Sequence, residues 1–143
     1  MADQVYFEDV NVGDEIPKLV KNCTTQQLVM WAAGSGDMYQ IHYDKEFAAG
    51  NGLPGVIVHG ALKNAFLGQL LHDWLGDKGA IKKYSCQYRG MDVPGQDIIC
   101  RGVITEKSQE GGKNIVQLDI WTEKEGGEKT SPGKATVYLP SRG

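Results

Sequence analysis

The stretch "GALKNAFLGQLLHDWLG", residues 60–76, has the spacing of one long helix. Its apolar residues recur at three- and four-residue steps, which is the period of an amphipathic helix. They include Leu62, Ala65, Phe66, Leu70 and Trp74. Other apolar residues widen this arc and few charges flank it, so we expect a sheet to surround the helix. Gly76 is predicted to end it.

The sequence after Gly79 is typical of antiparallel strands joined by turns. Its segments are apolar or alternate with period two, and the turns between them contain Gly and Pro. The expected strands cover residues 80–93, 97–108, 113–124 and 134–140, and a further strand is expected within residues 14–24. One long helix and about five strands predict an α+β fold, formed as a single domain over residues 1–143.

The segment before the long helix is predicted to be mostly loop. Residues 26–34 are expected to form a short helix, because Thr and Gln residues before it match a capping pattern and glycines stop it. Asp37 then lies just past its end. Another brief helical turn is expected after Asp44, whose carboxylate suits the cap position.

Composition excludes several classes of function. A net charge of −3 without a basic stripe argues against a nucleic-acid partner. The three cysteines are odd in number and lack a CxxC spacing, which favours reduced thiols in an intracellular protein. No signal peptide or membrane span is indicated, so no membrane association and a cytoplasmic location are expected.

Three separated segments carry a resemblance to a known family. They are "WAAGSGDMYQIHYDKEFA" (31–48), "GVIVHGAL" (55–62) and "YRGMDVPGQDI" (88–98). The first resembles the pattern small-Gly-Asp-x-Asn-Pro-aliphatic-His of the MaoC-like, hydratase-2 group of hotdog-fold proteins. This resemblance implies a hotdog fold, in which an antiparallel sheet wraps one central helix. It also implies a hydro-lyase that hydrates a 2-enoyl thioester to a (3R)-3-hydroxyacyl thioester, with coenzyme A or acyl carrier protein as carrier and no cofactor.

Two residues depart from this pattern. Tyr39 and Gln40 stand where the family has Asn-Pro. Proline would fix one backbone angle and stiffen the loop between acid and histidine. The sequence keeps the spacing of Asp37 and His42 without this restraint.

Hydration of an enoyl thioester needs an acid, a base and donors for the carbonyl oxygen. Asp37 and His42 are the candidate acid–base pair, and spacing does not decide which of them is the base. Gly60 is the candidate oxyanion donor, because a helix N-terminus exposes free N–H groups and glycine allows close approach.

Further candidates surround this constellation. Ile41, His59 and Ala61 are assigned to the substrate-binding site. His59 is interpreted as a structural hydrogen-bonding residue rather than a third proton carrier. Arg89 is assigned to the phosphates of the carrier, with a solvated strand edge as the other interpretation. No metal is expected, because the histidine spacings match no ligand pattern.

Two alternative functions are weighed against the hydratase. A hotdog acyl-CoA thioesterase would resemble relatives that use a carboxylate on the central helix, and this helix has none before Asp73. A weakly active or non-catalytic acyl-binding subunit of a heteromeric dehydratase would be expected to lack the acid–histidine pattern. We expect a homodimer or higher homo-oligomer, and a heterodimer with a second hotdog subunit is the other arrangement, because an isolated sheet would leave an unpaired edge.

Overall fold

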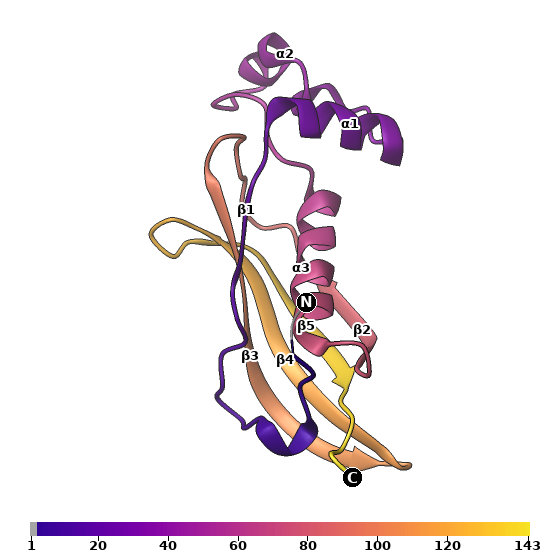
Figure 1. Ribbon diagram of the computed structural model, residues 1–143. Helices are drawn as coiled ribbons and strands as arrows, with labels where there is room; N and C mark the ends of the chain where they lie inside the picture. Colours follow the sequence, from indigo (N-terminus) through magenta and orange to yellow (C-terminus); the bar gives the residue numbers. More distant parts are fainter. Residues whose placement is uncertain (1–2) are drawn as a thin grey trace.

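The computed structural model describes residues 3–143 as a five-stranded antiparallel sheet curled around one long helix (Figure 1). The strands lie in the order β1-β3-β4-β5-β2. Their bounds are β1 Leu19–Asn22, β2 Ala80–Cys86, β3 Asp97–Glu110, β4 Lys113–Lys124 and β5 Lys129–Tyr138. This architecture is the hotdog fold, so the expected fold class is confirmed.

The central helix α3, Gly60–Leu75, matches the predicted range. Its apolar arc is buried against the inner face of the sheet and provides the centre of the core. Gly68 lets the helix approach β2 closely, since a Cβ there would lie 2.6 Å from the hydroxyl oxygen of Tyr84. None of the helices formed by residues 3–143 combines the length and apolar character needed to cross a membrane.

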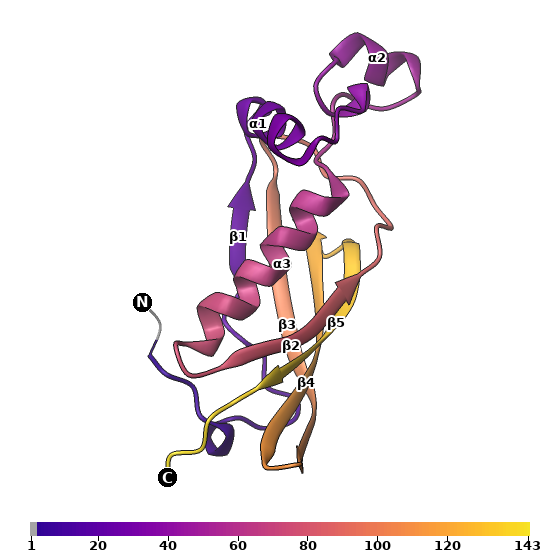
Figure 2. The ribbon, with the colours of Figure 1, turned by 90° about the vertical axis from the view of Figure 1, so that its right-hand side faces the viewer.

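Two shorter helices lie together beyond one end of the sheet (Figure 2). Helix α1, Thr25–Ser35, is capped by the Thr24 hydroxyl, which accepts from the Gln27 amide at 3.1 Å. Helix α2, Lys45–Gly50, is capped by the Asp44 carboxylate, which accepts from the Phe47 amide at 2.9 Å. Both predicted caps are therefore confirmed. Two short 3-10 helices, η1 (Phe7–Asp9) and η2 (Gln40–His42), complete the elements.

The strand predictions were wrong at two ends. The first strand, β1, lies within the expected residues 14–24 and begins after Pro17, which lacks an amide for the ladder; an isolated bridge, Glu15 to Val103, precedes it. The second ends at Cys86 rather than residue 93, although the amides of Gln87, Arg89 and Gly90 still donate to carbonyls of β5. The last begins at Lys129, since the strand continues through a Pro-Gly pair that the sequence suggested was a turn.

Candidate active site

Asp37 and His42 lie side by side at the α1 end of the molecule. Gly36 ends α1 in the left-handed conformation, with φ of 80°, and so turns the chain towards Asp37. The short helix η2 then positions His42, and its Nε2 lies 3.8 Å from Asp37 Oδ2. The structure thus brings the predicted acid–base pair together, with Asp37 half exposed and His42 buried.

A backbone carbonyl fixes the tautomer of His42. Its Nδ1 lies 2.7 Å from the carbonyl oxygen of Ile57, which can only accept, so Nδ1 carries the proton. In the neutral ring, Nε2 therefore presents a lone pair on the side of Asp37. The Ile57 amide also donates to the Ile41 carbonyl at 3.1 Å. The sequence did not reveal these contacts of Ile57, because only its backbone takes part.

His59 is fully buried and stacks on His42. The two ring centroids are 3.8 Å apart with an angle of 20° between the planes. Within the described residues neither ring nitrogen of His59 makes a hydrogen bond of ordinary geometry, although the Asp37 backbone acts on the ring as a weak partner, so its interpretation as a structural hydrogen-bonding residue stays a prediction. Burial lowers the pKa of His59 below its usual 6.5, and the nearby His42 lowers it further. His59 is therefore neutral near pH 7.

Gly60 follows His59 directly and is the first residue of α3. An amide at this position has no partner inside the helix, and no hydrogen bond to it is formed by the described residues. The ring of Tyr88 packs against the glycine, since a Cβ at residue 60 would lie 2.6 Å from Tyr88 Cδ2. Residue 60 is therefore also constrained to be glycine because the Tyr88 ring lies so close to it.

A buried ion pair anchors the first turn of α3, and the sequence analysis did not predict it. Lys63 Nζ lies 3.0 Å from Asp92 Oδ2 and donates to the Gly90 carbonyl at 3.0 Å, and both charged side chains are almost fully buried. The Asp92 carbonyl also accepts from the Val58 amide at 2.8 Å. The only sequence signal was a lysine within the apolar helix, one turn after Gly60.

The remaining predicted residues lie in different surroundings. Ile41 is half-buried on η2, whereas Ala61 is exposed at the start of α3. Arg89 is exposed and bonds to the Gln87 side chain, an arrangement that does not test its proposed role. Tyr39 packs edge-on to His42 and Phe47, at centroid distances of 6.3 and 5.9 Å.

One group of potential metal ligands is found in residues 3–143. It consists of Asp37, His42 and His59, whose donor atoms lie within 4.8 Å of one another. Ligands about 2.1 Å from a tetrahedral zinc ion lie roughly 3.4 Å apart. The observed separations, 3.8 Å between Asp37 and His42 and up to 4.8 Å within the group, are wider than this spacing.

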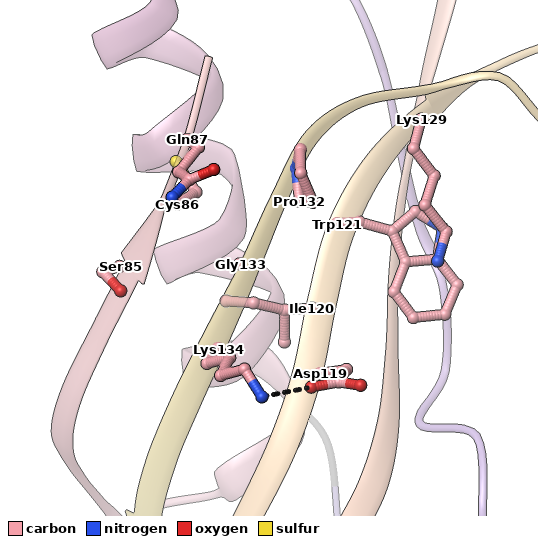
Figure 3. A pocket seen from close by; sticks show the side chains of 10 residues that line it. All are labelled: Ser85, Cys86, Gln87, Asp119, Ile120, Trp121, Lys129, Pro132, Gly133 and Lys134. Carbon is pink, nitrogen blue, oxygen red and sulfur yellow. Dashed lines mark ion pairs between the residues drawn. The ribbon is translucent and has the colours of Figure 1, made fainter. Parts of the chain in front are cut away.

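A separate hollow of about 370 Å³ lies on the sheet over β2, β4 and β5 (Figure 3). Lys134 and Asp119 pair at 3.6 Å in it, and Cys86 lies at its edge. Burial raises the pKa of Cys86 above its usual value and that of Cys100 to about 12, so neither thiol is activated as a nucleophile. None of the predicted site residues lines this hollow.

Comparisons with known proteins identify the class. The family model described as "MaoC like domain" matches residues 10–124. The fatty acid synthase beta subunit TOXC of Cochliobolus carbonum is 34% identical over 96% of the chain. The chain covers 7% of that relative, and 6 to 7% of the curated relatives it matches.

Solved structures agree with this assignment. The (R)-hydratase from A. caviae involved in PHA biosynthesis superposes with a TM-score of 0.80 at 26% identity, over 93% of this chain and 99% of that one. R-hydratase PhaJ1 from Pseudomonas aeruginosa gives a TM-score of 0.86 at 21% identity, over 97% of this chain and 88% of that one. The chain belongs to the MaoC-like dehydratase family.

Proposed function

We propose that this chain hydrates a trans-2-enoyl thioester reversibly to a (3R)-3-hydroxyacyl thioester. The observation that carries the proposal is the approach of Asp37 to His42 at 3.8 Å, with the His42 lone pair directed towards the acid. The neighbouring Gly60 amide adds a donor for the thioester carbonyl. The similarity to the A. caviae (R)-hydratase, which extends over 99% of the hydratase chain, supports the R stereochemistry.

The fixed tautomer supports His42 as the base. Its Nε2 takes a proton from water as the water oxygen bonds to C3 of the substrate, and the electrons move to the thioester oxygen. Gly60 N–H and the N-terminus of α3 stabilise that oxyanion. The imidazolium then returns the proton to C2, so one water is added and no other reactant is needed. Asp37 orients the water and stabilises the imidazolium.

Two features support this reaction over the alternatives. The carboxylate of α3 is Asp73, which is exposed in the last turn, so the helix offers no base for thioester hydrolysis near Gly60. A non-catalytic subunit would not need a buried histidine aligned on an acid. We propose coenzyme A as the carrier, with acyl carrier protein as the other carrier to be tested.

We also propose that the chain works as a symmetric dimer, with a heterodimer as the other arrangement. Strand β2 is an edge strand that pairs with β5 alone, and it exposes Lys82 and Lys83. Asp37 is half exposed in the single chain, so a second subunit would help to enclose the acyl group. Light scattering on the purified chain tests the stoichiometry, and a monomer at working concentration would contradict this part.

A turnover assay tests the reaction itself. Short and long trans-2-enoyl-CoAs are offered to wild type, to His42→Ala and to His72→Ala, and loss of the enoyl thioester is followed. His72 is a matched control, since it is an exposed histidine near the other end of α3. We expect wild type and His72→Ala to hydrate at least one substrate, and His42→Ala to be slower by about 100-fold or more. Equal rates for all three proteins, or no turnover by wild type, would contradict the proposal.

A further inference from the structure

His59 presents an unexplained buried polar group. It is 0% exposed, it stacks on His42, and within the described residues neither ring nitrogen makes a hydrogen bond of ordinary geometry, although the Asp37 backbone acts on the ring as a weak hydrogen-bond partner. Buried polar side chains in native proteins are almost always hydrogen-bonded, because an unmet hydrogen bond is energetically costly. An apolar aromatic residue would fill the same space without that penalty. Because the contact with the Asp37 backbone falls short of ordinary hydrogen-bond geometry, the imidazole can take a further partner that is not a protein atom.

The separations around His59 suit a water molecule. A donor atom from each of Asp37, His42 and His59 lies within 4.8 Å of the other two, and the acid and His42 are 3.8 Å apart. Partners about 2.8 Å from one water oxygen, in tetrahedral directions, lie roughly 4.6 Å apart. Three polar groups at such spacing meet the requirement for an ordered buried water.

We propose that His59 is a third catalytic residue, which donates a hydrogen bond to the water that Asp37 and His42 activate. This inference rests on the proposed hydration. The water donates one hydrogen to His42 Nε2 and the other to the Asp37 carboxylate. A His59 N–H donates to one lone pair of the water oxygen, and the second lone pair is left to attack C3 of the enoyl group.

The surroundings of His59 agree with this role. The neutral ring has one N–H to donate and does not repel the imidazolium that forms at His42. The stacking fixes the plane of His59 relative to His42, and a donor atom of each ring lies within 4.8 Å of the other and of Asp37, so one water can contact all three side chains. The backbone next to His59 is held by the bond from the Val58 amide to the Asp92 carbonyl. The geometry thus orders the water before the substrate arrives.

Substitution of His59 tests the role. His59→Phe keeps an aromatic ring on His42 but removes the donor. We expect kcat for the best enoyl-CoA to fall by about 10- to 100-fold while KM stays within about two-fold, because the lost bond is to the water and not to the substrate. The amide nitrogen of Asn or Gln can take the place of Nδ1 or Nε2, so one of these variants should recover part of kcat. His72→Ala is the control.

The outcomes separate this inference from the proposed function. If wild type hydrates enoyl-CoA and His59→Phe keeps the wild-type kcat, His59 is not catalytic and the hydratase assignment stands. If wild type hydrates no thioester, the proposed function is wrong. A high-resolution crystal structure of wild type decides the water independently of activity and of how the variant folds. Water bonded to all three side chains supports the inference, and water bonded to Asp37 and His42 alone overturns it.

Discussion

The candidate site joins two regions that are built differently. Asp37 lies on a half-exposed segment after α1, and short-range backbone turns hold that segment. The segment from Val58 to Lys63 on the other side is mostly buried, with Ala61 exposed, and Asp92 and Lys63 tie it to the loop after β2. His42 connects the two, because its ring bonds to Ile57 and stacks on His59.

The two regions should therefore respond differently to substitution. The buried region contains Gly60 and His59, the proposed donors, and its contacts are long-range, so loss of those contacts should affect folding as well as rate. Asp37 in the exposed region carries a half-exposed charge, so removing that charge should affect rate far more than stability. The predictions below test this contrast, beginning with the largest expected effect.

Removing one partner of the buried ion pair should give the largest loss of stability. Lys63→Met leaves Asp92 charged and unpaired in the core, which should lower the free energy of unfolding by about 3–5 kcal/mol. Urea unfolding followed by circular dichroism measures it. Lys134→Met is the matched control, because its ion pair with Asp119 is exposed and should contribute about 0–1 kcal/mol.

The double variant sharpens this test. Replacing both charges, in Lys63→Met with Asp92→Leu, removes the unpaired group and should recover most of the lost stability. A single variant as stable as wild type would show that the pair does not anchor the first turn of α3.

Gly60→Ala should have the next largest effect, and it should act on rate. The new methyl group would lie 2.6 Å from Tyr88 Cδ2, so it must displace an exposed ring. It also crowds the amide proposed as oxyanion donor, and we expect kcat to fall about 100-fold. Stability should change by less, because alanine favours the helix and Tyr88 can move into solvent.

A second substitution isolates the cause of that loss. Tyr88→Ala combined with Gly60→Ala removes the steric conflict but leaves the methyl group beside the amide. If the double variant regains the full rate, the glycine is needed for Tyr88 alone and not for the oxyanion.

The buried imidazole should make stability depend on pH. The pKa of His59 is lower in the folded chain than its usual 6.5, so between those two values the unfolded chain binds more protons. Its contribution is complete above pH 6.5 and is lost as pH falls through the folded pKa. Urea unfolding from pH 7.5 down to 5 should show a smaller decline in His59→Phe than in wild type. An equal loss of stability in the two proteins would show that folding does not lower the pKa of His59.

Gln40→Pro should have the smallest effect. Gln40 begins η2 and Tyr39 before it is extended, with ψ of 125°, so proline fits without strain. Loss of freedom in the unfolded chain should raise the free energy of unfolding by about 0.4–1 kcal/mol. Because Ile57 already holds this loop through Ile41 and His42, kcat should change by less than about three-fold. A large gain in kcat would show that the loop is poorly ordered without proline.

The sequence predicted the parts of the site that depend on local pattern. The periodicity of α3, the caps at Thr24 and Asp44 and the spacing of Asp37 and His42 are all set within a few residues. Each of these features has a short-range physical cause, so it could be predicted before the fold was known.

The parts that were missed depend on contacts between distant segments. The stack of His59 on His42 joins residues 17 positions apart, and the Lys63 to Asp92 pair joins residues 29 apart. Ile57 acts through its backbone, which any residue type shares. Regular pairing of β2 ends at Cys86, although alternation in the sequence and backbone bonds to β5 continue past it.

The most direct test of the central claim measures rate and stability together in Asp37→Asn. The substitution keeps the shape of the side chain and removes its charge at a half-exposed position. We predict that enoyl-CoA hydration falls by about 10²- to 10⁴-fold while the free energy of unfolding stays within about 0.5 kcal/mol of wild type. An unchanged hydration rate would contradict the account.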